Sequence, residues 1–125
     1  MATQEDVRRL ALALPEASED EGHFAFSVPV KGKRKGFVWI WMERVAPKKP
    51  RQPNSGVIAV RVRDEEEKDM WLASDPAVFF TEPHYAGFPA VLIRLDAIDV
   101  DRLREVIVGG WRCMAPPAVV NRWDH

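Results

Sequence analysis

The sequence predicts an α+β fold, a two-layer sandwich in which an antiparallel sheet carries its helices on one face. Short runs of alternating apolar and polar residues, joined by turn-rich connections, are typical of hairpin-linked strands. Segments with helical periodicity carry their apolar residues on one side, so each helix needs a single buried face. The elements follow in the order α-β-β-β-α-β-β-α, which favours one sheet with helices packed beside it.

The length and composition are those of a globular domain. The chain has 125 residues, which fits one domain spanning residues 1–125. Its single cysteine cannot form an internal disulfide. No apolar run approaches the ~18 residues of a membrane-spanning helix, and the N-terminal residues do not resemble a signal peptide, so we expect a cytoplasmic protein with no membrane partner. The net charge of −1 argues against an overall nucleic-acid-binding field, so any such role must come from local patches.

A first helix and an acidic loop open the chain. Thr3 is expected to cap the helix, with Asp6 completing a capping box, and Pro15 ends it. The carboxylates that follow either hold a hard cation or form a solvated loop, and their spacing matches no calcium-binding loop, which favours the solvated loop. These acidic residues are Glu16, Glu19, Asp20 and Glu21.

Two strands, residues 23–30 and 37–43, are predicted to form a hairpin joined by a basic turn over residues 31–36. Basic hairpin tips often contact phosphates, and they are also a common way to keep a turn soluble, so both interpretations stay open. The basic residues of this turn are Lys31, Lys33, Arg34 and Lys35.

Residues 46–56 are rich in proline and are predicted as an extended loop before the next strand, residues 57–63. Successive turns of a meander lie at opposite ends of a sheet, about 20 Å apart for strands of this length. The two basic loops should therefore act as two separate phosphate contacts. The basic residues of this second loop are Lys48, Lys49 and Arg51.

Asp64 is predicted to cap a second helix over residues 65–74, whose first-turn glutamates suit the helix dipole. A short strand, residues 77–81, and a turn-rich connection, residues 82–89, follow. His84 in this connection is either a binding residue or a structural hydrogen-bonding residue.

Residues 90–96 are apolar at positions of both parities, which predicts an interior strand. A third helix follows, capped by Asp99, with apolar residues spaced three and four apart up to Met114. A proline pair ends this helix, and one more turn is expected over residues 118–125.

The strand over residues 37–43 is apolar on both faces, so one of its rows must lie on the sheet face that carries no helices. Its two rows are Phe37, Trp39 and Trp41, and Val38, Ile40 and Met42. Aliphatic rows in the later strands are expected to face the helices: Ile58, Val60, Val62, Val91, Ile93 and Leu95. This arrangement gathers five residues on the open face: Trp39, Trp41, Arg61, Arg63 and Arg94. The reverse, with the tryptophans facing the helices, stays open.

Either arrangement leaves an apolar row on the open face, so we expect a dimer contact, a bound partner or a covering loop there. Residues 46–56 are the expected cover. Arginines beside tryptophans on an open sheet could stack nucleic-acid bases, and they equally resemble the anchor cluster of a protein interface.

Signatures of catalysis and of cofactor binding are missing from the sequence. There is no G-x-S-x-G nucleophile turn, no P-loop and no Rossmann glycine pattern. The three histidines and the cysteine show no metal-ligand spacing. We therefore expect no catalytic residues, no metal and no cofactor, and predict that the protein is not an enzyme.

Seven short stretches in a fixed order carry a family resemblance: Leu14-Pro15-Glu16-Ala17, Gly22-His23-Phe24-Ala25-Phe26, Ser74-Asp75-Pro76-Ala77-Val78-Phe79-Phe80, Pro83-His84-Tyr85, Gly87-Phe88-Pro89-Ala90-Val91-Leu92-Ile93-Arg94-Leu95, Trp111-Arg112 and Ala115-Pro116. From about Asp6 to Trp123 the chain resembles the MmcQ/YjbR-like family. The resemblance implies a two-layer fold like that of secretion chaperones, DNA as a partner, and no catalytic residues. The chain departs from the family pattern in a longer loop over residues 46–56 and in the absence of a basic residue after Pro116.

Two function hypotheses follow. The first is a small DNA-binding protein that uses the local basic loops and the open sheet face. The second is a protein-interaction or chaperone-like adaptor, in which the apolar open face pairs with a second copy or with another protein.

Overall fold

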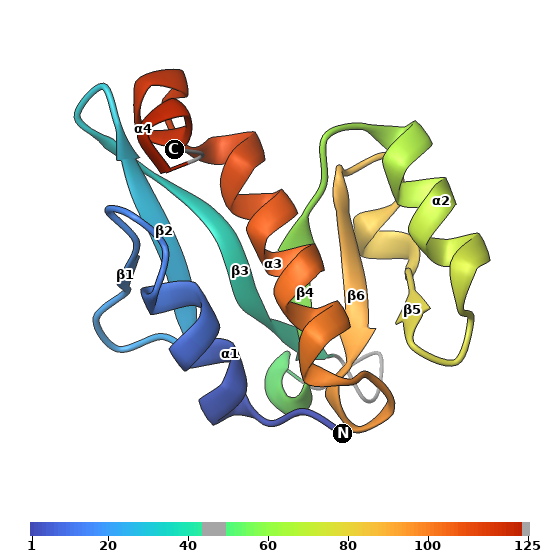
Figure 1. The fold of residues 1–125 in the computed structure, drawn as a ribbon. Coiled ribbons are helices and arrows are strands. Elements are labelled where there is room, and N and C mark those ends of the chain that lie inside the picture. Colours follow the sequence, from blue (N-terminus) through green and yellow to red (C-terminus); the bar gives the residue numbers. More distant parts are fainter. Residues whose placement is uncertain (44–49, 124–125) are drawn as a thin grey trace.

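The computed structural model describes residues 1–43 and 50–123 (Figure 1). Its helices and strands alternate along the chain much as the sequence predicts. The elements are α1 (Gln4–Leu12), β1 (Ser18–Glu19), β2 (Ala25–Val30), β3 (Lys33–Glu43), β4 (Gln52–Arg61), α2 (Glu65–Ser74), β5 (Phe79–Phe80), the 3-10 helix η1 (Pro83–Tyr85), β6 (Ala90–Arg94), the 3-10 helix η2 (Leu95–Ala97), α3 (Val100–Met114) and α4 (Pro117–Trp123).

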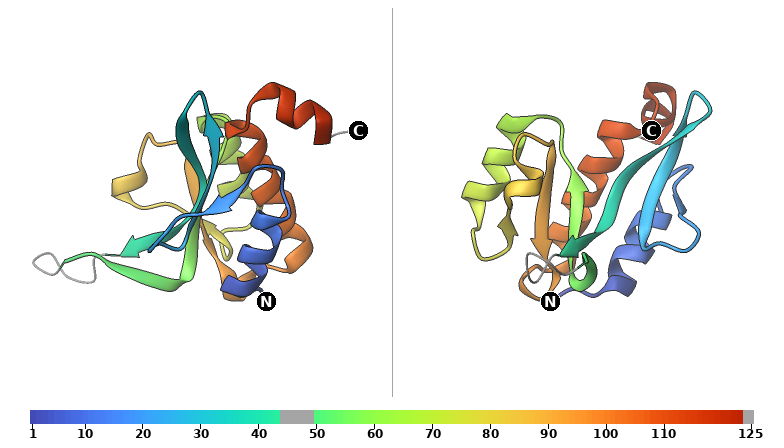
Figure 2. Two further views of the ribbon diagram at one scale, coloured as in Figure 1. Left: turned by 90° about the vertical axis from the view of Figure 1, so that its left-hand side faces the viewer. Right: turned by 180° about the vertical axis from the view of Figure 1, so that it is seen from behind.

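One sheet organises the fold. Its strands follow the spatial order β1-β2-β3-β4-β6-β5, and every neighbouring pair is antiparallel. Helices α1 and α3 lie against one face, and α2 lies beside β5 and β6 at one edge. Seen from the side, α1 and α3 occupy one side of the sheet and η1 the other (Figure 2). The predicted α+β sandwich with an antiparallel sheet is therefore confirmed.

The helix starts follow the predicted capping chemistry. The Thr3 hydroxyl accepts from the backbone N–H of Asp6, whose carboxylate accepts in return from the Thr3 N–H, so the capping box is complete. The side chains of Asp64 and Asp99 accept backbone N–H groups in the first turns of α2 and α3, at 2.9 and 2.7 Å. The starts of α1, α2 and α3 are thus each capped by the short polar side chain that the sequence predicts.

The turn between β2 and β3 is shorter than predicted. It consists of Lys31 and Gly32, whose φ angles of 51° and 82° are left-handed, as a two-residue hairpin turn requires. Strand β3 already begins at Lys33, so Lys33, Arg34 and Lys35 are strand residues rather than turn residues.

Strand β4 begins earlier than predicted. Residues 52–56 belong to it, although they were expected in a loop, while residues 46–49 of that loop lie outside the described residues. Pro53 pairs with Met42 of β3, on a part of β4 that has no second neighbour because β6 pairs only with Val57–Arg61. Such an edge position tolerates proline, since no second ladder needs its missing N–H.

The acidic loop after α1 is held by partners from its own chain. The Glu19 carboxylate accepts from Arg8 at 2.8 Å, and this hydrogen bond lowers the pKa of Glu19. Asp20 accepts from the Ser27 hydroxyl at 2.8 Å, and Glu16 pairs with Arg122 at 3.3 Å. These contacts fit neither a freely solvated loop nor a cation site, because the carboxylates serve to attach the loop to α1, β2 and α4.

Helix α3 approaches the sheet closely at Gly110. A Cβ at this position would lie 2.9 Å from Val60 Cγ1, 3.0 Å from the Arg61 carbonyl oxygen and 3.2 Å from the Phe37 carbonyl oxygen. Two of these three neighbours are backbone atoms, which cannot swing aside as the end of a side chain can. The absence of a side chain therefore sets how deeply α3 packs onto β3 and β4.

Replacing Gly110 with alanine should lower the free energy of unfolding by about 1–3 kcal/mol, because the new methyl group overpacks the helix–sheet contact. Gly109→Ala is the matched control. Nothing lies within 4 Å of a Cβ there, so helix propensity should stabilise that variant by up to about 1 kcal/mol. Urea denaturation of both variants measures the difference. Equal stability of the two variants would contradict this packing account.

Candidate functional site

The sheet face opposite α1 and α3 carries a row of side chains that crosses four strands. Trp39 of β3 pairs with Ala59 of β4, which pairs with Leu92 of β6, which pairs with Phe80 of β5. Residues that pair directly share one face of a sheet. Trp39, Trp41 and Phe80 pack against a buried cluster on this face that comprises Val57, Ala59, Tyr85, Ala90 and Leu92.

The predicted orientation of the strands is confirmed for both tryptophans. The six aliphatic residues expected to face the helices all belong to the helix-side core, which also holds Trp111: Ile58, Val60, Val62, Val91, Ile93 and Leu95. Val38 joins them, so Trp39 and Trp41 point to the open face as predicted.

Phe37 departs from the predicted row because of a β-bulge. Val38 pairs with Phe26 and Gly36 pairs with Ser27, so Phe37 is an extra residue in β3. A bulge breaks the strict alternation of side chains. Phe37 is accordingly fully buried in the helix-side core beside Val38, and not in the row of Trp39.

The same bulge determines which face of the sheet each basic residue of β3 occupies. Lys33 and Lys35 pair with Val30 and Val28, which pack in the helix-side core. Lys33 and Lys35 therefore lie on the helix side of the sheet. Arg34, between them, turns to the other side. It donates to the Ser27 hydroxyl and to the Ser27 carbonyl, both at 2.8 Å, and it also contacts the Ser18 hydroxyl.

The segment over residues 82–89, which includes η1, covers part of the open face. Tyr85 is 8% exposed, and its hydroxyl oxygen accepts from Trp39 Nε1 at 3.0 Å. The Phe88 ring meets Trp39 edge to face, with 6.2 Å between ring centroids. The cover is therefore this segment. The prediction that residues 46–56 form the cover is wrong for residues 52–56, which are part of β4.

Lys68 of α2 holds the covering segment in place. Its side chain is buried, with 2% of the residue exposed, and Nζ donates to the carbonyl oxygens of Tyr85 at 2.6 Å and Phe88 at 2.9 Å. Lys68 was not among the predicted site residues, because a lysine in a charged helix normally points to solvent. The available signal was its spacing, since Lys68 lies three and four residues before Trp71 and Leu72 and so shares their inward face.

A hollow of about 240 Å³ opens where the covering segment meets the sheet. It is lined by Trp39, His84, Tyr85 and Phe88. His84 is exposed and its ring stands 5.8 Å from that of Tyr85, while Phe88 is 40% exposed. Two of the predicted site residues, Trp39 and His84, line this hollow, whereas Tyr85 and Phe88 were not among the predicted site residues.

Two arginines lie on aromatic rings of this face. The Arg61 guanidinium is 5.2 Å from the centroid of Phe88, and that of Arg94 is 4.0 Å from the centroid of Phe80. Trp41 meets Phe80 edge to face at 5.6 Å. The open face therefore carries two groups of side chains, which we call aromatic layers because each consists of packed rings with one arginine. The upper layer consists of Trp39, Tyr85, Phe88 and Arg61, and the lower layer consists of Trp41, Phe80 and Arg94.

Several polar atoms of this face are buried without a hydrogen-bond partner. Within residues 1–43 and 50–123 they are Trp41 Nε1, Arg61 Nε and Glu82 Oε1. Most buried polar groups in folded proteins are paired, because an unpaired one costs about 1–3 kcal/mol. Unused hydrogen-bonding capacity is therefore concentrated on the open face and its covering segment.

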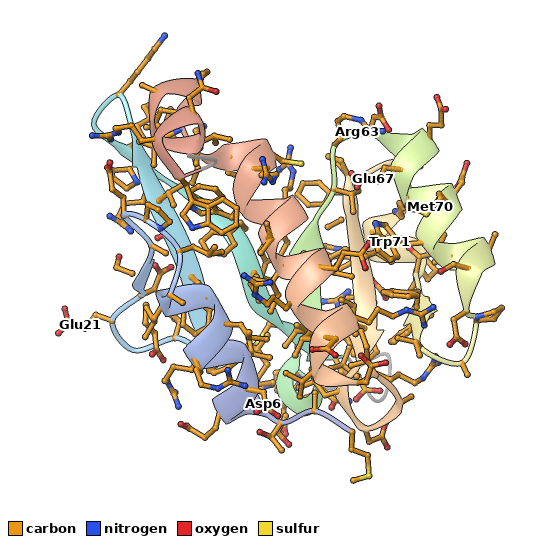
Figure 3. All side chains as sticks on the ribbon, in the orientation of Figure 1. Asp6, Glu21, Arg63, Glu67, Met70 and Trp71 are labelled. Carbon is orange, nitrogen blue, oxygen red and sulfur yellow. The ribbon has the colours of Figure 1, made fainter. Side chains whose placement is uncertain are left out.

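Other predicted site residues lie elsewhere. Arg63 follows the last residue of β4, so strand alternation no longer directs it, and it lines a separate hollow with Glu67 and Cys113. Figure 3 shows it near Glu67 at the start of α2. Its hydrogen bond to Asp64 raises the pKa of the Arg63 guanidinium. The prediction that Arg63 joins Arg61 on the open face is wrong.

Among the remaining basic residues, Lys31 is exposed in the hairpin turn. Arg51 donates to the Met42 carbonyl at 2.9 Å and so helps to join β3 and β4. Lys48 and Lys49 lie outside the described residues. The described basic side chains therefore do not form a single patch.

This architecture is that of an α+β sandwich with one face largely free of helices. A family model described as YjbR matches residues 12–113, and the chain belongs to the YjbR family. Uncharacterised proteins of Mycobacterium bovis and Mycobacterium tuberculosis are 36% identical over 130 residues, which cover 97% of this chain and 95% of theirs. A crystal structure of a Deinococcus radiodurans protein with a DUF419 domain matches with a TM-score of 0.65 and 18% identity, over 89% of this chain and 77% of that one. This structural likeness supports the fold alone.

In the described part of the chain, no helix is both long and apolar enough to cross a membrane.

Replacing Lys68 with methionine should loosen the covering segment, because the carbonyl oxygens of Tyr85 and Phe88 lose a charged donor. The expected loss of stability is about 1.5–3 kcal/mol, and backbone amides of residues 85–90 should exchange hydrogen faster. Lys35→Met, at an exposed position, is the control and should change neither quantity. Unchanged exchange in the Lys68 variant would show that other contacts hold the segment.

Proposed function

We propose that this protein is a cytoplasmic, non-enzymatic protein that binds single-stranded DNA on its open sheet face. The observation that carries the proposal is the pair of aromatic layers, each with an arginine stacked on a ring: Arg61 on Phe88 and Arg94 on Phe80. Proteins that bind single strands combine aromatic platforms, on which bases stack, with cationic side chains that track the backbone.

The spacing of the layers supports a single strand as the ligand. Trp39 and Trp41 are two residues apart on β3, which is about 7 Å along a strand. Two successive unstacked bases can therefore meet the two layers. Base faces are available only when the bases are unpaired, and a net charge of −1 gives no general attraction for duplex phosphates.

The positions of the charged side chains indicate which of them should contact the DNA phosphates. Arg61 and Arg94 lie on the open face, beside the rings that would stack the bases. Lys33 and Lys35 lie on the opposite face of the sheet, because they pair with Val30 and Val28 of the helix-side core. Phosphate contacts are therefore assigned to the two arginines, and the two lysines serve as controls.

Fluorescence anisotropy of a labelled 15-nucleotide dT strand at several salt concentrations tests the proposal. Phe88→Ala should weaken binding about tenfold or more, since a base–aromatic stack contributes about 1–3 kcal/mol. Phe88 is 40% exposed, so its loss should cost less stability than the loss of a fully buried phenylalanine such as Phe37. Replacing Arg61 and Arg94 together with glutamine should flatten the salt dependence, whereas replacing Lys33 and Lys35 should not.

Two outcomes would count against single-stranded DNA. Equal affinity for a duplex of the same length would show that base stacking is not the source of binding. No binding to either nucleic acid, together with self-association in sedimentation that Trp41→Ser abolishes, would favour a protein interface on the same face.

A further inference from the structure

Every described side chain that lines the hollow beside Trp39 is aromatic. The lining consists of Trp39, His84, Tyr85 and Phe88, around a space of about 240 Å³. Neighbouring rings stand steeply to one another, with interplanar angles of 73° between Trp39 and Phe88 and 88° between Tyr85 and Phe88. The rings of His84 and Tyr85 cross at 66°. The rings therefore form walls that face in different directions, and not a stack of parallel plates.

Three of these walls are held in place by bonds within the chain. The Tyr85 hydroxyl oxygen accepts from Trp39 Nε1 at 3.0 Å, which joins the two rings. Lys68 Nζ donates to the carbonyl oxygens of Tyr85 and Phe88, which fixes the backbone that carries both rings. A ligand that enters the hollow therefore has little loop or side-chain freedom to remove, and such preorganisation favours binding.

Steeply crossed aromatic walls suit a compact cation. The face of an aromatic ring carries partial negative charge, and it attracts a cation within about 6 Å of the ring centroid. A flat ligand stacks on one of the crossed rings at a time, whereas a compact group contacts several of them together. The same cluster already holds one cation in this way, since the Arg61 guanidinium lies 5.2 Å from the centroid of Phe88.

A trimethylammonium group has the size and the chemistry for this hollow. Together with its linking carbon it has five heavy atoms, which occupy roughly 150 Å³ if each takes about the volume of a water molecule. It carries a positive charge but no N–H, so it needs no hydrogen-bond acceptor from the walls. A primary ammonium, in contrast, must exchange three hydrogen bonds to water for acceptors that aromatic rings do not provide.

Two charged side chains close to the hollow act on such a cation in opposite directions. Glu82 belongs to the covering segment, and within residues 1–43 and 50–123 its Oε1 is buried without a hydrogen-bond partner, so its negative charge favours a cation nearby. Arg61, on the Phe88 ring, repels it. Neither residue lines the hollow, so the rings make the contacts, and the repulsion by Arg61 provides a test.

We propose that the hollow lined by Trp39, His84, Tyr85 and Phe88 binds a trimethylammonium group, such as that of choline or of a trimethylated lysine side chain. Cation–π attraction to the rings holds the group, and the indole of Trp39 is the strongest of these walls. This site goes beyond the proposed DNA binding and does not depend on it. A cation in the hollow and a base stacked on Phe88 would exclude each other.

Isothermal titration calorimetry compares choline with dimethylbutanol, the neutral isostere in which a carbon replaces the charged nitrogen. The wild-type protein should bind choline about tenfold more tightly than the isostere, because only choline gains cation–π attraction. Phe88→Leu keeps an apolar side chain but removes one ring face, so it should reduce this preference several-fold. A peptide with one trimethyllysine, compared with the same peptide carrying unmodified lysine, forms the second arm. Its affinity relative to that of choline distinguishes a protein source of the group from a small molecule.

Two arginine variants test the position of the cation. Arg61→Gln removes the like charge beside the hollow and should tighten choline binding several-fold. Arg94→Gln is the matched control, because its guanidinium lies on Phe80 outside the hollow, and it should leave choline binding unchanged. Urea denaturation checks that each variant is folded.

Three results would overturn the proposal. The first is equal binding of choline and its neutral isostere, or no binding of choline and of the trimethyllysine peptide. The second is an equal loss of affinity for choline and for the isostere in folded Phe88→Leu, which would indicate a merely apolar hollow. The third is weaker choline binding by folded Arg61→Gln. None of these titrations contains DNA, so their failure leaves the proposed DNA binding intact, and a failure of DNA binding leaves this site intact.

Discussion

The arrangement of the open sheet face depends on one buried cation. Lys68 leaves α2 toward the interior and donates to the carbonyl oxygens of Tyr85 and Phe88, which are far from it in sequence. A buried ammonium must be paired, because an unpaired buried charge costs several kcal/mol. This requirement fixes the covering segment over residues 82–89 against the helix, sets Tyr85 beside Trp39, and uses the acceptors that the segment would otherwise present. Helix α2 thus shapes a surface of which it forms no part.

Much of the fold could be predicted because it follows from local chemistry. The helix starts follow from short polar caps, and α2 has the bounds that were predicted from its cap and its glutamates. The orientation of Trp39 and Trp41 followed from a comparison between strands: aliphatic rows in β4 and β6 had to meet the helices, which left the tryptophans on the other face. That inference succeeded because β3 itself keeps its alternation from Val38 to Met42: the register shift between Ile40 and Trp41 places its extra residues in β4.

The failures come from places where the ladder is irregular or where distant segments meet. The extra residue at Phe37 interrupts the alternation of β3, so Phe37 lies in the helix-side core and not in the predicted row with Trp39 and Trp41. No local pattern in the sequence marks this bulge. Strand alternation also ends with β4, so Arg63, which lies beyond the end of this strand, is not on the open face. The position of Phe88 on the open face could not be predicted, because it depends on where Lys68 of helix α2 holds the covering segment.

The five tryptophans provide the most direct measurement of the central claim, which is that ligand binds on the face opposite the helices. Each indole N–H gives its own signal in a two-dimensional ¹H–¹⁵N NMR spectrum. Trp39 and Trp41 lie on the open face, whereas Trp71, Trp111 and Trp123 pack with the helix-side core. Titration with a dT strand should shift the signals of Trp39 and Trp41 and leave that of Trp111, which is fully buried and donates to the Pro15 carbonyl, in place. Shifts confined to Trp71, Trp111 or Trp123 would contradict the account.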